Sequence, residues 1–211
     1  MKFFDPHGDI RFTQNRLPHW QQSEAVYFVT FRLADALPKL LLEQWQDERN
    51  AWLKFHPLPW SADVEREYHR RFSLRIEHWL DAGHGSCVLR YRVCAREIAT
   101  ALRHFDGTRV NIVSFVVMPN HVHALFATVN GWPLENLVHS WKRQSAVRIN
   151  RLIHSSGALW QRDYFDRLVR DEKHFAMCVR YIRNNATKAH LRPGEYILYE
   201  SDFARAVGEA V

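Results

Sequence analysis

Two apolar segments separated by only two residues place the strongest constraint on the fold. The segments "RVNIVSFVVM" (109–118) and "HVHALFATV" (121–129) are rich in β-branched residues, which is typical of strands. Pro119 and Asn120, which lie between them, are turn-forming residues. The sequence therefore predicts two strands joined by a tight connection, which favours antiparallel pairing.

The remaining periodic segments predict an α+β fold. Strands are expected at 25–33 and 158–170, and Ser61 and Gly83 mark the N-cap and the stop of one helix. Apart from the segment around 37–105, the order is strand–helix–strand–strand–helix–strand–helix. This order favours a ferredoxin-like or RRM-like antiparallel sheet with helices on one face. The expected helices are 37–56, 61–83, about 92–105, 133–153 and 171–191.

Length and composition indicate one globular domain. We expect a single domain over residues 1–211, with a helical insertion at about 37–83 and a C-terminal tail from about 193 that shows no clear pattern. With 46% hydrophobic residues the chain can bury a real core. No membrane span or signal peptide is visible, and three widely spaced cysteines suggest reduced thiols, so a cytoplasmic protein is expected.

Positive charge is concentrated in the last third of the sequence. Residues 141–192 contain 12 Lys and Arg against 4 Asp and Glu, although the whole chain carries a net charge of only +6. Such a concentration is typical of a face that binds a polyanion. On charge alone, a solvated basic surface is an equally good interpretation.

The second strand of the tight pair carries His121 and His123 where apolar residues would pack better. Because side chains alternate along a strand, both imidazoles project from one face while Val122, Ala124 and Phe126 point into the core. Two neutral imidazoles side by side can bind a divalent metal. The alternative is a pair of partly exposed histidines on an open sheet face.

The helix expected at 171–191 adds polar groups with helical spacing. Tyr181, Asn185 and Lys188 share a face at the edge of its buried stripe. They could reach a neighbouring site together, although a boundary tyrosine more often packs its ring and exposes its hydroxyl.

These motifs together resemble a known family. "MPNHVHALF" is followed by "WKR", by "LWQRDYFDRLVRDEKHF" and by "VRYIRNNATKAHL". The series resembles the single-tyrosine HUH transposases, and most closely the REP-associated tyrosine transposases. HUH denotes a histidine, a bulky apolar residue and a histidine, here residues 121–123. Ala186 and His190 depart from the family pattern, which commonly has proline and glycine at these positions.

The resemblance implies a site and a reaction. Tyr181 falls at the position of the nucleophile, and Asn185 at that of a polar residue that often completes the metal site. His121 and His123 are the implied histidine ligands, and Mg²⁺ or Mn²⁺ is the implied ion. Lys188 is expected to help Tyr181 to ionise. The implied activity is cleavage and transfer of single-stranded DNA through a 5′-phosphotyrosine, often beside repeated palindromic (REP-type) hairpin elements.

Single-stranded or hairpin DNA is the expected partner, bound by a monomer or a homodimer. Basic side chains of the last third are expected to contact its phosphates. They are Lys142, Arg143, Arg151, Arg162, Arg167 and Arg183. Trp160 and Phe165 are candidates for base stacking, although both are more often core residues.

Four alternatives stay open at this point. Tyr164, within "WQRDYFD", is the rival nucleophile. An RRM-like sheet could bind single-stranded nucleic acid without cutting it, and another HUH nuclease (a replication initiator or a relaxase) would share the two histidines. A metal-dependent hydrolase ranks last, because no HExxH motif or similar carboxylate-rich motif accompanies the histidines.

Overall fold

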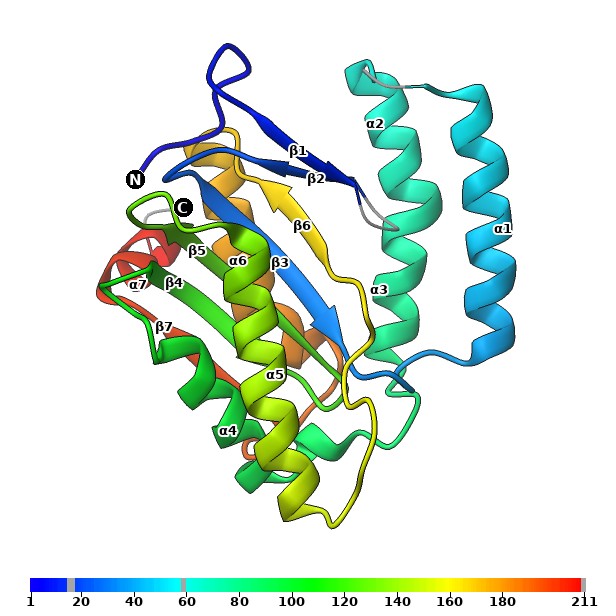
Figure 1. Cartoon of the computed structure of the whole chain (residues 1–211), viewed down its shortest axis with the longest axis vertical. Coiled ribbons are helices and arrows are strands. Elements are labelled where there is room, and N and C mark those ends of the chain that lie inside the picture. Colours follow the sequence, from blue (N-terminus) through cyan, green and yellow to red (C-terminus); the bar gives the residue numbers. More distant parts are fainter. Residues whose placement is uncertain (15–17, 58–59, 210–211) are drawn as a thin grey trace.

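The computed structural model describes residues 1–14, 18–57 and 60–209. Within these ranges the main sheet has five antiparallel strands in the order β6-β3-β5-β4-β7 (Figure 1). The strands are β3 (Val26–Arg32), β4 (Val110–Val117), β5 (His121–Thr128), β6 (Phe165–Leu168) and β7 (Ile197–Glu200). The tight pair expected from the sequence is therefore confirmed as β4 and β5, two neighbours inside this sheet.

The connectivity β3-α4-β4-β5-α5-β6 is that of a ferredoxin-like fold, which confirms the predicted α+β class. Helices α4 (Arg92–Arg103) and α5 (Leu134–Leu152) cover one face of the sheet, as expected. Phe31, Phe126 and Trp141 are fully buried in the core on this side. Each of the two helices presents an apolar stripe to the sheet, so burial of that stripe fixes its orientation.

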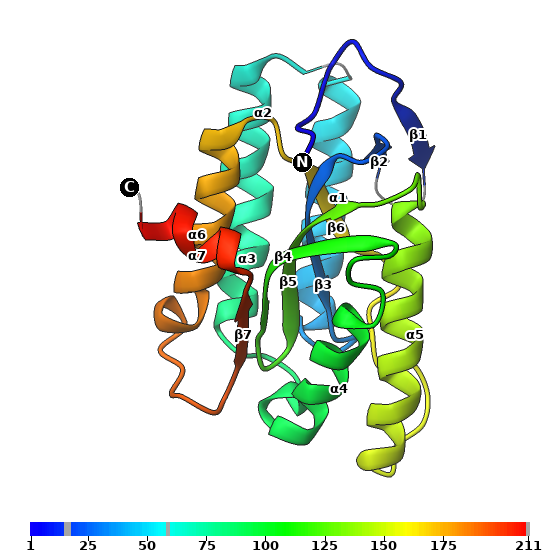
Figure 2. The same ribbon diagram turned by 90° about the vertical axis from the view of Figure 1, so that its left-hand side faces the viewer.

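Contrary to the expectation of helices on one face only, a second layer of helices covers the opposite face of the sheet (Figure 2). It consists of α6 (Glu172–Lys188) and α7 (Asp202–Glu209). Val179 and Ile182 of α6 join a buried cluster that includes Leu125 of β5. Because β5 is covered on both sides, all eight of its residues are buried.

The expected helical insertion lies between β3 and α4. Helix α1 (Lys39–Phe55) packs against a second rod made of α2 (Ala62–Tyr68), a π-helical turn (His69–Ser73) and α3 (Leu74–Asp81). Figure 1 shows the two rods side by side at the edge of the sheet, next to β6. The insertion therefore adds a wall to one end of the strand array.

The predicted start and stop of this second rod are confirmed. The amide of Val64 donates to the hydroxyl of Ser61 at 3.4 Å, and Gly83 follows the last turn with a φ of 70°. Trp45, Trp52 and Phe72 form an aromatic core between the rods, and the ring of Trp45 also contacts the ring of Phe165 in β6. The insertion is thus packed onto the sheet.

Three further features of the fold differ from the sequence expectation. Strand β6 is much shorter than 158–170, because only its last part pairs with β3. The segment after 193 forms β7 and α7. Every residue of β7 is half-buried, so β7 lacks the alternation of buried and exposed side chains that marks many strands. An N-terminal hairpin of β1 (Arg11–Gln14) and β2 (Pro18–Gln21) was not anticipated. Within the described ranges, no helix combines the length and apolar character needed to span a bilayer.

Candidate metal and nucleophile site

His121 and His123 lie on the face of β5 that α6 covers, whereas Val122, Ala124 and Phe126 belong to the core on the other face. Both imidazoles are buried, with only 1% and 2% of their surfaces exposed. The alternative of a partly exposed pair is therefore wrong. The two Nε2 atoms lie 3.0 Å apart, and the ring planes are nearly perpendicular, at 78°.

Each imidazole is held at its other ring nitrogen. Nδ1 of His121 donates to the amide oxygen of Asn120 at 2.8 Å, and the amide nitrogen of Asn120 donates to two backbone carbonyls at 3.1 and 3.2 Å. Because an amide oxygen only accepts, Nε2 of His121 carries a lone pair. Nδ1 of His123 lies 2.7 Å from the hydroxyl of Thr30, which can accept or donate and so permits either tautomer.

Burial keeps both rings neutral. It lowers the pKa of His121 to about 3, and the positive charges of Arg32 and Lys188 add to the effect. Burial also lowers the pKa of His123 well below its usual value, followed by the influence of His121 and Lys188. Neutral imidazoles offer lone pairs to a cation, so the electrostatics of the pair suit a metal ligand set.

Tyr181 of α6 lies over the same face of the sheet. Its ring centroid is 5.1 Å from that of His123 and 5.6 Å from that of Phe28, and both contacts are edge-to-face. Burial raises the pKa of Tyr181 above its usual value, and the carboxyls of Glu77 and Asp81 raise it further. The hydroxyl is near Glu77 and Asn185, although neither contact meets the geometry of a regular hydrogen bond.

Asn185 lies one helical turn after Tyr181 and is 1% exposed. Neither atom of its amide has a hydrogen-bond partner among the described residues. An unpaired buried amide costs about 1–3 kcal/mol, so native structures rarely leave one without a purpose. The two imidazoles and the unsatisfied amide oxygen are therefore groups that could serve as metal ligands.

The insertion contributes two carboxyls that the sequence did not single out. Asp81 forms an ion pair with Lys188 at 2.9 Å, which joins α3 to α6. Glu77 lies beside the hydroxyl of Tyr181, and burial raises the pKa of its carboxyl. The four-residue spacing of Glu77 and Asp81 puts both on one side of α3, but only tertiary packing shows that this side meets Tyr181.

The middle of the chain matches a family model. Residues 88–185 match the model described as transposase IS200 like. The match covers just under half of the chain, so over these residues the chain is similar to the IS200-like transposases. The matched segment includes both histidines, Tyr181 and Asn185, and it excludes the helical insertion.

Solved structures of transposases also align with the chain. One is a REP-associated tyrosine transposase bound to a REP hairpin, with 15% sequence identity over 83% of this chain and 74% of that chain, at a TM-score of 0.46. Another is a putative transposase from Deinococcus radiodurans R1, with 16% identity over 88% of this chain and 98% of that chain, at a TM-score of 0.33. No curated protein matches the chain significantly.

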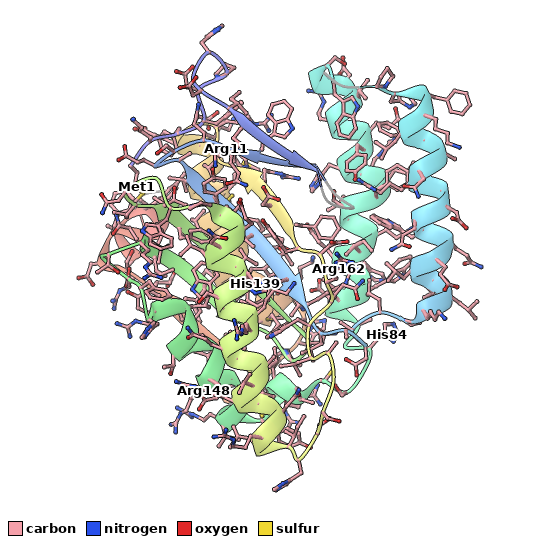
Figure 3. All side chains as sticks on the ribbon, in the orientation of Figure 1. Met1, Arg11, His84, His139, Arg148 and Arg162 are labelled. Carbon is pink, nitrogen blue, oxygen red and sulfur yellow. The ribbon has the colours of Figure 1, made fainter. Side chains whose placement is uncertain are left out.

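The predicted DNA-binding residues lie on different surfaces of the protein. Arg143 and Arg151 are exposed on α5, on the face of the sheet away from the histidines. Arg167 is exposed on β6, where it pairs in register with Phe28 and so lies on the histidine side. Arg162 is exposed in the segment before β6, and in the view of Figure 3 it lies between α5 and the insertion.

Besides Arg167, whose Nη2 lies 3.1 Å from Nδ1 of His69, two of the predicted basic residues are engaged within the protein. The ammonium of Lys142 donates to the backbone carbonyls of Gln161 and Arg162, each at 2.7 Å, and burial lowers its pKa to about 8. Arg183 forms an ion pair with Glu200 at 2.8 Å. In this structure both side chains hold elements of the fold together.

The rival tyrosine lies elsewhere in the structure. Tyr164 is 7% exposed in the large core cluster, and burial followed by the charges of Asp166 and Glu135 raises its pKa. Glu135 belongs to α5, so this environment is on the face opposite to the histidines. Trp160 is also a core residue, and its indole donates to Ser145, whereas Phe165 is half-buried beside the insertion.

Proposed function

We propose that the chain is a metal-dependent single-stranded DNA endonuclease and strand transferase that forms a 5′-phosphotyrosine on Tyr181 and acts on repeated palindromic (REP-type) hairpin elements. One observation carries the proposal. Two convergent imidazoles, a tyrosine ring 5.1 Å from His123 and an unsatisfied buried amide occupy one face of the sheet. The match of the same residues to the IS200-like transposase model supports this class of reaction.

His121, His123 and Asn185 would hold Mg²⁺ or Mn²⁺. The Nε2 atoms of the two histidines converge at 3.0 Å, and the amide oxygen of Asn185 is unpaired and so could serve as a further ligand. A bound ion would act as a Lewis acid on the scissile phosphate.

Tyr181 supplies the nucleophile in this proposal. Its oxygen forms a bond to phosphorus, the bond from phosphorus to the 3′ oxygen breaks, and the leaving strand keeps a free 3′-hydroxyl. One phosphodiester replaces another, so the reverse step can join DNA without a nucleotide cofactor. The absence of a GxxxxGK[ST] motif from the sequence agrees with this.

Glu77 is placed to accept the tyrosine proton. Of the two carboxyls of the insertion that raise the pKa of Tyr181, that of Glu77 has the larger effect. Burial raises the pKa of Glu77 itself. A carboxyl with a raised pKa is a stronger base, which suits an acceptor that works near neutral pH. Lys188, which is paired with Asp81, contributes positive charge near the histidines and Glu77.

The basic residues lie on two sides of the sheet, so they would contact different parts of the DNA. Arg167 is on the side of the histidines, so it would meet the strand that is cut. Arg143 and Arg151 are exposed on the other side, so they would meet only a flanking part such as a hairpin stem. Unpaired DNA is favoured at the site itself because its phosphate must approach a nucleophile buried between α6 and the sheet.

Adduct formation tests the proposal. Protein incubated with a 3′-labelled hairpin oligonucleotide and Mn²⁺ should give a covalent complex that survives denaturing electrophoresis. Chelation, or replacement of both His121 and His123 by alanine, should abolish the complex while most of the DNA affinity is retained. Asn185→Ala should instead raise the Mn²⁺ concentration needed for half-maximal activity. Full cleavage by the double variant in the presence of chelator would reject the metal site.

A further inference from the structure

A cleft of about 420 Å³ lies beside the histidine pair, between the insertion and the edge of the sheet. Helix α1 lines it with Gln46, Arg49 and Asn50, and β3 lines it with Thr30 and Arg32. Its volume falls within the range of small-ligand sites. Because one wall comes from the insertion, the cleft depends on a segment outside the matched transposase residues.

Two arginines in this cleft are buried without a matching carboxylate. Arg32 is 8% exposed and Arg49 is 6% exposed, and neither forms an ion pair within the described part of the chain. Nε of Arg49 donates to the hydroxyl of Tyr68 at 2.6 Å, and its guanidinium lies over the ring of Trp45. Asp163, which also lines the cleft, is the carboxyl that acts on Arg32 from a distance.

Burial of the two charges is only partly offset. Desolvation lowers the pKa of Arg32 to about 10, although Asp163 opposes the shift. Two guanidiniums against one carboxyl leave the cleft positive, and buried charges are normally paired. The cleft therefore suits an anion, and the planar donors of arginine suit a phosphate in particular.

The register of the sheet connects the cleft to the histidines. Thr30 lies opposite His123 and Arg32 lies opposite His121 in the pairing of β3 with β5. The hydroxyl of Thr30 also contacts Nδ1 of His123, so Thr30 belongs both to the cleft and to the histidine site. A DNA strand with one phosphate at the histidines would therefore bring a neighbouring nucleotide to the cleft.

The other groups of the cleft favour a nucleotide over a bare phosphate. Gln46, Asn50 and Gln161 offer amides, which can donate and accept and so can read the edge of a base. Phe165 is half-buried at the same place and presents an aromatic surface. A base and its phosphate would use both kinds of group.

We propose that this cleft binds one unpaired nucleotide of the substrate strand next to the scissile phosphate. Arg32 and Arg49 hold its phosphate, and the amides of α1 contact its base. This inference rests on the proposed function, and it gives the insertion a role in selecting the DNA that is cut.

Arg49→Gln tests the inference in the full-length protein. Dissociation constants are measured for single-stranded oligonucleotides that carry one neutral methylphosphonate linkage, or one abasic position, at successive sites around the cleavage point. For the unaltered protein we expect one linkage and one adjacent base at which the change weakens binding about tenfold. Arg49→Gln should weaken binding of unmodified DNA about as much, and the neutral linkage at that position should then have no further effect.

Two other variants complete the design. Arg71→Gln is the matched control, because Arg71 is exposed on the same insertion, is paired with Glu48 and does not line the cleft; it should bind like the unaltered protein. Asn50→Ala, at an exposed position, should remove the effect of the abasic site and provides the test if Arg49→Gln does not fold.

The results separate the two proposals. If the protein forms the Tyr181 adduct but Arg49→Gln and Asn50→Ala bind every oligonucleotide as the unaltered protein does, the nucleotide cleft is wrong and the proposed function stands. If no adduct forms but one linkage depends on Arg49, the cleft stands and the cleavage reaction is wrong. Absence of any position-dependent loss in the unaltered protein would also overturn the cleft.

Discussion

The proposed reaction requires Tyr181 to lose its proton, and its surroundings make this difficult. A tyrosine has an ordinary pKa of about 10, and burial beside two carboxyls raises the pKa of Tyr181 further. Attack on phosphorus requires the proton to leave, so an acceptor in contact with the hydroxyl is needed. Glu77 occupies that position, and its contribution can be tested separately from DNA binding.

Glu77→Gln should slow formation of the covalent adduct about 100-fold, because general-base catalysis typically contributes 10²- to 10⁴-fold. Affinity for DNA should change little, since the amide has nearly the shape of the carboxyl. Single-turnover rates and dissociation constants measured on the same oligonucleotide separate the two effects. Glu43→Gln is the control, an exposed carboxyl on the same insertion. An unchanged rate in Glu77→Gln would exclude Glu77 as the proton acceptor.

Stability against acid should depend on the histidine pair. In the unfolded chain a histidine titrates near 6.5, whereas the pKa of His121 in the folded protein is lowered to about 3. The unfolded state therefore binds the proton first, and stability that is complete above pH 6.5 is lost as the pH falls toward 3. Between pH 7.5 and 5, this residue should account for a loss of about 2 kcal/mol.

Denaturant unfolding in chelator at several pH values measures this loss. His121→Gln cannot be protonated at that position, so its free energy of unfolding should fall less steeply with acidification than that of the unaltered protein. Parallel pH dependences would show that His121 is not held neutral by burial.

Local periodicity explains which site residues the sequence could indicate. His121 and His123 are two positions apart on a strand, and Tyr181 and Asn185 are four apart on a helix, so each pair is visible within its own element. That the pairs meet follows from the packing of α6 on β5. Asn120 directly precedes His121, whereas Thr30 and Glu77 join the site from other segments, and no pattern in their own neighbourhoods marks them.

Among the helices, α3 and α6 meet beside the site. The histidines are almost fully buried, and the ion pair of Asp81 with Lys188 ties the two helices together. In the proposed reaction a phosphate has to approach the ion that the histidines would hold, so we expect one of these helices to move away from the sheet. The insertion is therefore part of the path to the site.

Asp81→Asn should loosen this contact. We expect faster hydrogen exchange of the backbone amides in α3, with a change in the free energy of unfolding below about 1 kcal/mol, because Lys188 is largely exposed and such pairs contribute little. Asp202→Asn removes an exposed ion pair with Arg205, away from α3, and should leave α3 unaffected. Unaltered exchange in α3 would mean that the ion pair does not hold the helix in place.

Elements with strong periodicity could be predicted, whereas short ones at the edges could not. The predicted helices at 37–56 and 133–153 correspond to α1 and α5 within a few residues. Strand β7, with the sequence ILYE, shows no alternation of apolar and polar residues, and its four residues are equally buried. Only its pairing with β4 defines it as a strand. The position of α6 on the second face of the sheet also depends on tertiary packing, because its apolar stripe would suit either face.

At the scale of the whole molecule, the basic residues form two separate surfaces for DNA. Arg143 and Arg151 lie on the side of α5, and Arg167 lies on the side of the histidines. The excess of positive charge in 141–192 is therefore not one patch. A substrate that contacts both surfaces has to extend around the edge of the sheet.

Charge reversal can separate these surfaces. Arg143→Glu combined with Arg151→Glu should weaken binding of a hairpin with unpaired flanks. The dependence of its log K on log salt should also flatten, by about 0.9 for each phosphate of the duplex stem that the variant no longer neutralises. The same double variant should bind a short unpaired oligonucleotide almost normally, whereas Arg167→Glu should weaken both. Equal reductions in affinity for the two substrates in the double variant would contradict the division into two surfaces.

The identity of the nucleophile is the central claim, and peptide mapping of the covalent adduct tests it most directly. After cleavage of a 3′-labelled oligonucleotide in Mn²⁺, tryptic digestion should place the nucleotide on the peptide that contains Tyr181. Tyr181→Phe should still bind the DNA and form no adduct, because it loses only the reacting oxygen, whereas Tyr164→Phe should still form one. A nucleotide on the peptide that contains Tyr164, or an adduct that persists in Tyr181→Phe, would contradict the account.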